Sequence, residues 1–179
     1  MESNVSRETN MKMNMRFDLV VVGGGHAGIE ASVAANKMGI KTALITMDKN
    51  AIGRMSCNPA IGGLAKGHLV REIDALGGIM GSFADLSGIQ FKMLNRSKGK
   101  AVWSPRAQID KKVYEKNIST YVRSQKNIQI IESEAKKILI KNNSVSGLML
   151  NNNKRINCSS VIITCLLYTS DAADEGLGV

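Results

Sequence analysis

Three features of the sequence predict an α/β domain built around a central parallel sheet. An apolar strand at residues 17–22 ends on glycines, and a helical pattern of small apolar side chains follows at once. Gly39 then leads into a second apolar strand at residues 42–46. Two further apolar runs, at residues 128–131 and 161–164, are short, as expected for buried strands of a parallel sheet.

The glycines that end the first strand have the spacing of a phosphate-binding turn. Gly23, Gly25 and Gly28 occupy the three glycine positions of the G-x-G-x-x-G fingerprint. The first permits the tight bend, the second lets the backbone approach a pyrophosphate, and the third lets helix and strand pack closely. Because the pattern stands between a strand and a helix, it favours a Rossmann-like nucleotide-binding unit over a glycine turn that binds nothing. The residues expected to contact the nucleotide are Gly23, Gly24, Gly25, His26, Ala27 and Gly28.

The second strand lacks the acidic residue that usually accepts the ribose hydroxyls. Thr46 ends that strand, and Asp48 follows two residues later. Either residue is able to accept a ribose hydrogen bond. The alternative for Asp48 is that it only opens the next loop.

The composition is that of a folded domain with a basic surface. The chain has 179 residues, enough for one domain and its core, and a net charge of +9. An excess of Lys and Arg suits an anionic partner such as nucleic acid, but it equally favours solubility. Aromatic residues make up only 4% of the chain, which argues against a plain nucleic-acid-binding domain that works by stacking bases.

Targeting and redox features point to the cytoplasm. The three cysteines form no disulfide framework and suit a reducing compartment. No apolar run is long enough to span a membrane, and no metal site is expected. Residues 1–16 are polar and carry both acids and bases, so we expect a disordered leader and not a secretory signal.

The middle of the chain predicts a long loop and two helices. Residues 48–63 contain Gly53, an Asn-Pro pair and two adjacent glycines, which predict an extended loop. Apolar spacing predicts a helix at residues 64–76, with His68 on its apolar face. That histidine is expected to be buried and hydrogen-bonded, with a catalytic role as the alternative. A second helix is expected at residues 106–123.

The end of the chain contains a hairpin and a foreign-looking tail. Alternating residues at 135–140 and 144–150 predict a small β-hairpin attached to the main fold. Residues 166–179 carry acids and no base, and the string resembles translated sequencing-adapter DNA. We expect this tail to be non-native, the alternative being a genuine divergent end. The expected nucleotide-binding domain therefore spans residues 17–165, after the leader at residues 1–16.

Four longer stretches, taken together, are specific enough to indicate a family. They are GGGHAGIEA from Gly23, MSCNPAIGG from Met55, KGHLVREIDALGG from Lys66 and RAQID from Arg106. The combination resembles the glucose-inhibited division protein A family over residues 17–164. Lys100 stands where that family usually shows proline, which is a minor departure.

The resemblance implies a Rossmann-like FAD-binding fold and a specific reaction. The family enzyme installs the carboxymethylaminomethyl group at C5 of the tRNA wobble uridine, with FAD reduced by NADH. Its partner is a folate-binding GTPase, in a heterotetramer, and the full-length chain is expected to form a homodimer. Because the family protein is several times longer, the resemblance implies that this chain is an N-terminal fragment, inactive by itself.

The resemblance also assigns roles to individual residues. The backbone of the glycine turn would hold the FAD pyrophosphate, and Ala135 matches a position whose backbone meets the adenine, unless it is a plain sheet residue. Cys57 is the catalytic candidate, because a thiolate near helix N–H groups and basic side chains has a lowered pKa and suits attack on C6 of uracil. Alternatively, Cys57 is a supporting thiol or a small apolar filler. His26 is expected to support the turn.

Alternatives remain for the roles of several other side chains and for the function of the chain. Asp110 is expected to tie a helix start to the flavin site or to form a structural salt link. The chain is alternatively a truncated, non-catalytic FAD-binding module, or part of the related folate- and FAD-dependent tRNA uracil-5-methyltransferase. A scattered basic set is suited to tRNA phosphates, although each member alone is typical of a solvated charge: Lys66, Arg71, Lys98, Lys100 and Arg106.

Overall fold

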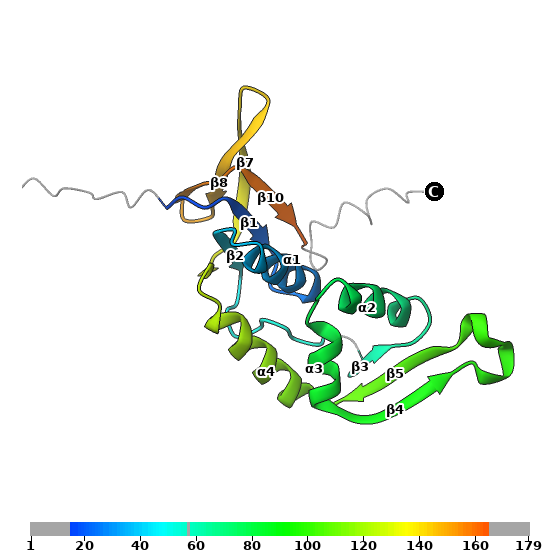
Figure 1. Cartoon of the computed structure of the whole chain (residues 1–179). Helices are drawn as coiled ribbons and strands as arrows, with labels where there is room; N and C mark the ends of the chain where they lie inside the picture. The colour runs from blue at the N-terminus through cyan, green and yellow to red at the C-terminus, as the bar shows by residue number, and fades with distance from the viewer. Residues whose placement is uncertain (1–14, 57, 165–179) are drawn as a thin grey trace, which may run out of the picture.

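Four parallel strands form the central sheet of the structure, a computed structural model that describes residues 15–56 and 58–164. Their order across the sheet is β10-β1-β2-β6, and every neighbouring pair is parallel (Figure 1). This confirms the predicted α/β fold with a parallel sheet. The strands are β1 (Leu19–Val22), β2 (Thr42–Thr46), β6 (Ile128–Glu132) and β10 (Ser160–Ile163).

Both faces of the central sheet are covered, and alternate side chains of its strands enter two separate cores. Val21 packs into the core that contains helices α1 (His26–Lys37) and α4 (Lys111–Ser124). Val20 enters the other core, with Leu148 of a smaller sheet. Each such side chain stabilises the fold by about 1.5–3 kcal/mol. This two-sided burial explains why β1 and β2 are continuously apolar.

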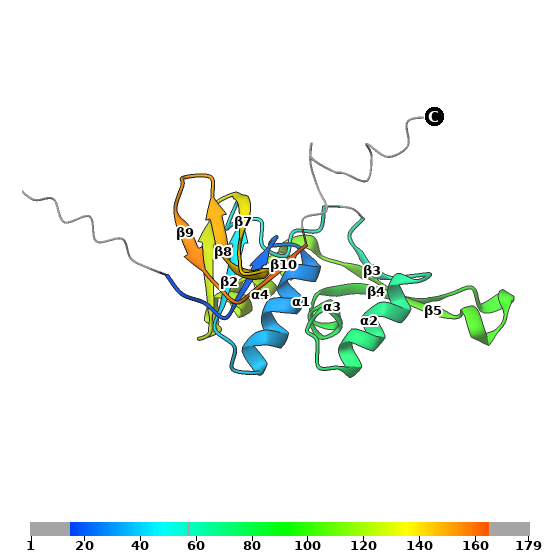
Figure 2. The same ribbon diagram turned by 90° about the horizontal axis from the view of Figure 1, so that it is seen from above.

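The smaller sheet is the predicted hairpin with one more strand. Strands β7 (Ala135–Lys141), β8 (Ser144–Leu150) and β9 (Arg155–Asn157) pair antiparallel in that order. Figure 2 shows them on one side of the central strands, with α1 on the other. Asn142 and Asn143 both have positive φ, 50° and 57°, as a tight hairpin turn requires.

A second antiparallel sheet and two helices occupy the middle of the chain. The sheet order is β3-β5-β4, so the expected loop at residues 48–63 contains one short strand. Two 3₁₀ turns cap the hairpin formed by β4 and β5 (Figure 1). The elements are β3 (Ala60–Gly62), α2 (Lys66–Ala75), α3 (Met80–Ser87), β4 (Gly88–Leu94), η1 (Arg96–Lys98), η2 (Lys100–Val102) and β5 (Ser104–Ile109).

The helix expected at residues 106–123 begins only at Lys111. The residues before it form β5, in which buried and half-buried side chains pair with both β3 and β4. Asp110 marks the boundary, because its carboxylate accepts hydrogen bonds from the N–H groups of Lys112 and Val113, at 2.9 and 3.1 Å. Asp110 is therefore the N-cap of α4, which explains why the helix cannot start earlier.

The apolar side of α2 faces outward, contrary to expectation. His68 is exposed, and Leu69 and Leu76 are 57% and 89% exposed, so the prediction of a buried histidine is wrong. The helix packs through Val70 and through Gly67, where an added Cβ would lie 2.6 Å from the Ser104 hydroxyl oxygen. Packing through a glycine is not visible in the spacing of apolar residues along the sequence. No helix among the described residues has the length and apolar character needed to cross a membrane.

Candidate dinucleotide-binding site

The carboxyl ends of the four parallel strands meet at one edge of the central sheet, where open α/β sheets bind their ligands. Gly23 follows β1 at this edge, and its N–H donates to the Ile45 carbonyl at 2.8 Å. Thr164 follows β10, and its N–H and hydroxyl both donate to the Val22 carbonyl, at 2.8 and 2.9 Å. These bonds connect the glycine turn to the strands on both sides.

Two of the fingerprint glycines are required by packing inside the protein. A Cβ on Gly28 would lie 1.9 Å from the Gly23 carbonyl oxygen, so only glycine lets α1 start this close to the turn. Gly23 has φ +118°, and a Cβ there would lie 2.5 Å from the Thr164 hydroxyl oxygen. Gly24 is similarly close to Thr46, at 2.9 Å from its hydroxyl oxygen. The turn is therefore packed against the start of α1, against Thr164 and against Thr46.

Gly25 differs from these glycines because its free side faces open space. A Cβ built there meets no atom within 4 Å, and the backbone angles, φ −76° and ψ −177°, suit any residue. Nothing inside the protein requires glycine at this position. Gly25 is also the N-cap of α1 and makes no side-chain cap, so the helix presents its first N–H groups and its positive end here. This geometry fits the pyrophosphate of a dinucleotide.

The end of β2 places Thr46 and Asp48 in different situations. The Thr46 hydroxyl donates to the Asp48 carbonyl at 3.1 Å, and Thr46 is buried. The Asp48 carboxylate accepts from the Asn50 N–H at 2.8 Å and lies 3.5 Å from the Arg54 guanidinium. These local bonds support the interpretation in which Asp48 opens the loop. Thr46 is then the remaining candidate for the ribose hydrogen bond.

The segment that carries Ala135 lies beside Thr46. Register pairs Thr46 with Glu132 across β2 and β6, and the Ser133 N–H donates to the Thr46 carbonyl at 2.9 Å. Ala135 follows at the start of β7 and packs against the second core. The fold thus brings Thr46 and Ala135 to the same edge as the glycine turn, where the adenosine half of a dinucleotide would be expected.

His26 stands in the first turn of α1 against the ring of Tyr114, with ring centroids 5.6 Å apart. Burial, reinforced by the nearby Lys66 ammonium, lowers the pKa of His26 to about 4. Burial also raises the pKa of Tyr114 above its usual range. Both side chains are therefore neutral at pH 7, which supports a structural role for His26 under the turn. Tyr114 was not identified from the sequence.

Acidification should destabilise the fold through His26. Below a pH of about 6.5 the unfolded chain binds a proton on this histidine, whereas the folded chain does so only near 4. Stability therefore falls as the pH falls through this window, by up to about 3 kcal/mol. Urea unfolding between pH 7 and pH 4 should show this loss, and His26→Gln should flatten it. An equally steep profile in the variant would contradict the assignment.

Glu30 is a site-supporting residue that the sequence alone did not identify. Its carboxylate accepts hydrogen bonds from the N–H groups of Ile79 and Met80, at 3.0 and 2.6 Å, and so caps α3 from a different helix. A Cβ on Gly78 would lie 2.8 Å from this carboxylate and 2.2 Å from Ile73, so the second glycine of the Gly-Gly pair makes room for the contact. This contact joins the stretch that begins at Gly23 to the residues that directly follow the stretch from Lys66.

The loop after β2 is fixed against the glycine turn. The Gly53 N–H donates to the Gly24 carbonyl at 3.1 Å, and the Met55 N–H donates to the Glu115 carboxylate at 3.1 Å. Met55 and its neighbour Ile52 are buried. Cys57, two residues after Met55, lies outside the described residues. The catalytic role of Cys57 stays a prediction.

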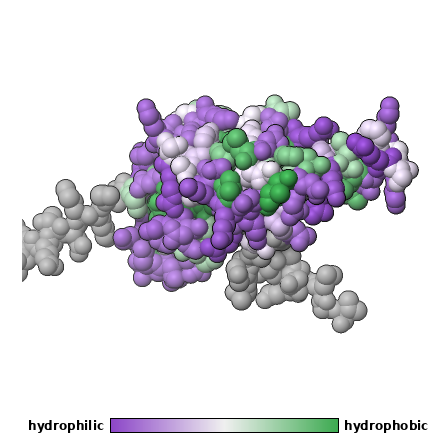
Figure 3. Space-filling view, turned by 90° about the horizontal axis from the view of Figure 1, so that it is seen from below, coloured by the Kyte–Doolittle hydropathy of each residue, from purple (hydrophilic) through white to green (hydrophobic). Residues whose placement is uncertain are grey.

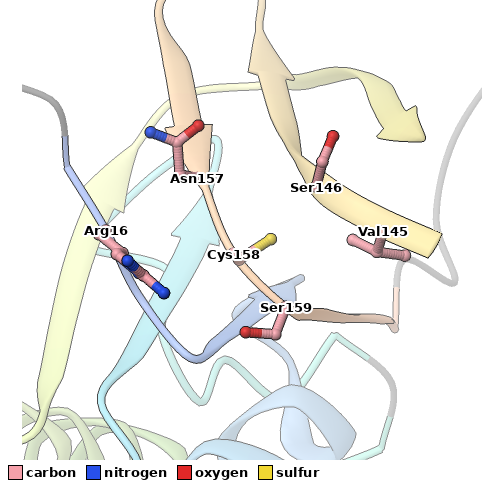
Figure 4. A pocket seen from close by; sticks show the side chains of 6 residues that line it. All are labelled: Arg16, Val145, Ser146, Asn157, Cys158 and Ser159. Atoms are coloured by element: carbon pink, nitrogen blue, oxygen red, sulfur yellow. The ribbon is translucent and has the colours of Figure 1, made fainter. Parts of the chain in front are cut away.

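Cys158 lines a hollow of about 400 Å³ away from the glycine turn (Figure 4). The hollow lies between the smaller sheet and the start of the described chain, and Arg16 and Ser146 contribute to its wall. Cys158 is 6% exposed, and burial raises the pKa of its thiol. Cys158 therefore belongs to the second core.

A parallel sheet whose first strand runs into this glycine turn defines a dinucleotide-binding α/β domain. The fold recurs at low identity in PqsL, a probable FAD-dependent monooxygenase from Pseudomonas aeruginosa: 12% identity and a TM-score of 0.58, over 82% of this chain and 41% of that one. Within this class, the chain belongs to the family described as glucose inhibited division protein A, whose model matches residues 18–169.

Two relatives show how much of the family protein is represented. The chain is 55% identical over 148 residues to the tRNA uridine 5-carboxymethylaminomethyl modification enzyme MnmG of Aquifex aeolicus, which is 83% of this chain and 24% of the relative. The solved structure of Aquifex aeolicus GidA superposes with a TM-score of 0.80 at 54% identity, over 83% of this chain and 25% of that one. The chain thus spans about a quarter of the relatives' length.

Proposed function

We propose that this chain is the FAD-binding part of an enzyme that installs the carboxymethylaminomethyl group at C5 of tRNA wobble uridine 34. One observation carries the proposal: Gly25 leaves an open cradle at the start of α1, in a chain that belongs to this family. The other fingerprint glycines are explained by packing, whereas the absence of a side chain at Gly25 is explained by a bound pyrophosphate.

The residues at the sheet edge would divide the cofactor between them. The backbone of residues 23–28 would hold the pyrophosphate, Thr46 would stand at the ribose, and the backbone at Ala135 would meet the adenine. His26 is neutral, so it adds no positive charge to the turn and supports it by packing on Tyr114. When bound, FAD supplies the redox chemistry, with NADH as the reductant in the whole protein.

Cys57 is the residue of this chain that we propose to act on the tRNA. The backbone of Gly53 bonds to the glycine turn at Gly24, and that of Met55, two residues before Cys57, bonds to Glu115 of α4. A cysteine thiolate is able to add to C6 of uracil and make C5 reactive toward a one-carbon unit. The whole protein would work with a folate-binding GTPase subunit and as a homodimer.

A chimera tests the proposed function. Residues 17–164 of this chain would replace the matching segment of the Aquifex aeolicus relative, which is 55% identical there. We expect the chimera to bind FAD, to oxidise NADH and to form the modified wobble uridine with the GTPase subunit. Cys57→Ser in the chimera should reduce modification at least about 10³-fold while FAD content stays the same.

The matched control is Cys158→Ser, at a cysteine placed in the core away from the turn. We expect this variant to keep its modification activity. A chimera that folds and binds FAD but never modifies tRNA would refute the proposed reaction. Full activity of Cys57→Ser would remove that residue from the mechanism, and modification by the 179-residue chain alone would show that the rest of the relative is dispensable.

A further inference from the structure

The hairpin of β4 and β5 is strongly basic, and its tip projects from the molecule. We call residues 88–109 the basic hairpin; it extends away from the remaining elements in both Figure 1 and Figure 2. The segment contains no Asp or Glu. Its cations are Lys92, Arg96, Lys98, Lys100 and Arg106. Figure 3 shows that the projecting end of the molecule is largely hydrophilic.

The pairing of the two strands places like charges together. Lys92 and Arg106 are directly opposite each other in the antiparallel register, an arrangement that costs stability. Within the described part of the chain, the ion pairs are Lys49 with Glu132 and Arg54 with Asp48, so the basic hairpin takes part in none. An unneutralised pair of this kind is stabilised when an anion binds between or beside the two cations.

A hollow at the base of the basic hairpin is lined by four cations and two carboxylates. It has a volume of about 520 Å³ and lies between the hairpin and helices α2 and α3. Arg71 of α2 lines it together with Lys92, Arg96 and Arg106, and two carboxylates, Asp74 and Asp85, also contribute to the wall. Arg71 and Arg106, two of the basic residues scattered in the sequence, therefore meet at this hollow.

Aromatic side chains accompany these cations. Trp103, the only tryptophan of the chain, is 37% exposed beside the tip of the hairpin, and its indole N–H donates to the Arg96 carbonyl at 3.3 Å. Phe91 on β4 is 59% exposed. Cations with exposed flat rings are the combination that binds unpaired nucleotides, because phosphates pair with the cations while bases stack on the rings.

We propose that the basic hairpin is an RNA-binding surface, on which Lys92, Arg96 and Arg106 hold phosphates and Trp103 stacks on an unpaired base. The proposal rests on the proposed function, since it names the surface of this chain that would hold the tRNA. It explains the opposed cations and the exposed indole, which packing inside the protein does not require. An acidic protein surface would neutralise the cations but offers no base for Trp103.

The single tryptophan allows a direct test with the 179-residue chain. The probe is a synthetic, unmodified anticodon stem-loop RNA with uridine at the wobble position. We expect it to quench the emission of Trp103, and a fluorescein-labelled copy to report affinity by anisotropy at several salt concentrations. Replacing Lys92, Arg96 and Arg106 by Gln should weaken binding about tenfold or more and lower the salt slope by about 2.

A matched variant controls for net charge. Replacing Lys136, Lys137 and Lys141 of β7 by Gln removes the same charge from exposed positions on the smaller sheet. We expect this control to bind RNA almost as tightly as the unchanged chain. Trp103→Leu should weaken binding by roughly tenfold through lost stacking, with the salt slope unchanged.

Each outcome decides the proposal. Equal losses in the two triple variants, or RNA binding without quenching of Trp103, would overturn it, and so would the absence of RNA binding. Quenching by polyglutamate as strong as by RNA would assign the surface to an acidic protein instead. FAD titration of the same samples tests the proposed function separately from the RNA-binding surface. A chain that binds RNA through the hairpin but never binds FAD refutes the proposed function and leaves the RNA-binding proposal intact.

Discussion

Gly25→Val is expected to abolish FAD binding while the fold stays intact. The new side chain would extend into the open space at the start of α1, where a Cβ meets no protein atom within 4 Å, and would fill the place of the pyrophosphate. The backbone there is extended, so valine causes no strain. Loss of the phosphate contacts should weaken FAD binding at least about 100-fold, measured by quenching of flavin fluorescence on titration.

The control for this prediction lies on the same helix. Ala34→Val adds a β-branched side chain at an exposed position of α1, two turns further along, and should leave FAD affinity unchanged. Thermal unfolding followed by circular dichroism should give the same midpoint for Gly25→Val and the unchanged chain. Gly25→Val with undiminished affinity for FAD would show that the pyrophosphate binds elsewhere.

Gly28→Ala, unlike Gly25→Val, is expected to cause a large loss of stability. The added methyl group would lie 1.9 Å from the Gly23 carbonyl oxygen and 2.8 Å from the Thr164 hydroxyl oxygen. Backbone atoms cannot rotate away, so α1 must move off the sheet. We expect a cost of about 3 kcal/mol, which lowers the midpoint of thermal unfolding by roughly 10 °C.

Helix propensity alone would predict the opposite effect for Gly28→Ala, a gain of stability. In a helix without tertiary contacts, replacing glycine by alanine adds about 1 kcal/mol of stability, so a loss has to come from packing. Gly25→Ala, in the same turn but without a clash, is the comparison and should unfold at nearly the same urea concentration as the unchanged chain. A Gly28→Ala variant that is as stable as Gly25→Ala would mean that α1 does not approach the turn this closely.

Much of the parallel core was predictable because its signals are local. β1 and β2 are buried on both faces, which requires continuous apolar runs that are visible in the sequence. The turn after β1 depends on glycine spacing, and the hairpin of β7 and β8 on alternation and a two-asparagine turn. Each of these features is determined by about ten neighbouring residues.

The failures have a common physical origin in contacts between distant segments. The apolar residues of α2 predicted burial, yet the helix packs through Gly67 and Val70 and leaves Leu69 and Leu76 exposed. The start of the expected second helix is instead β5, because residues 104–109 gain strand partners on both sides. Local pattern cannot report which partners a segment will meet.

The sequence by itself determined the class of fold, the family and the glycine turn, since strand pattern and glycine spacing act over a few residues. Only the tertiary structure decided the rest. It showed that Gly28 is glycine for packing whereas Gly25 faces open space. It also placed Glu30 as the cap of α3, Tyr114 against His26, and Lys92 opposite Arg106. These relations join residues far apart in the chain, and they form only when burial of the two cores brings their elements together.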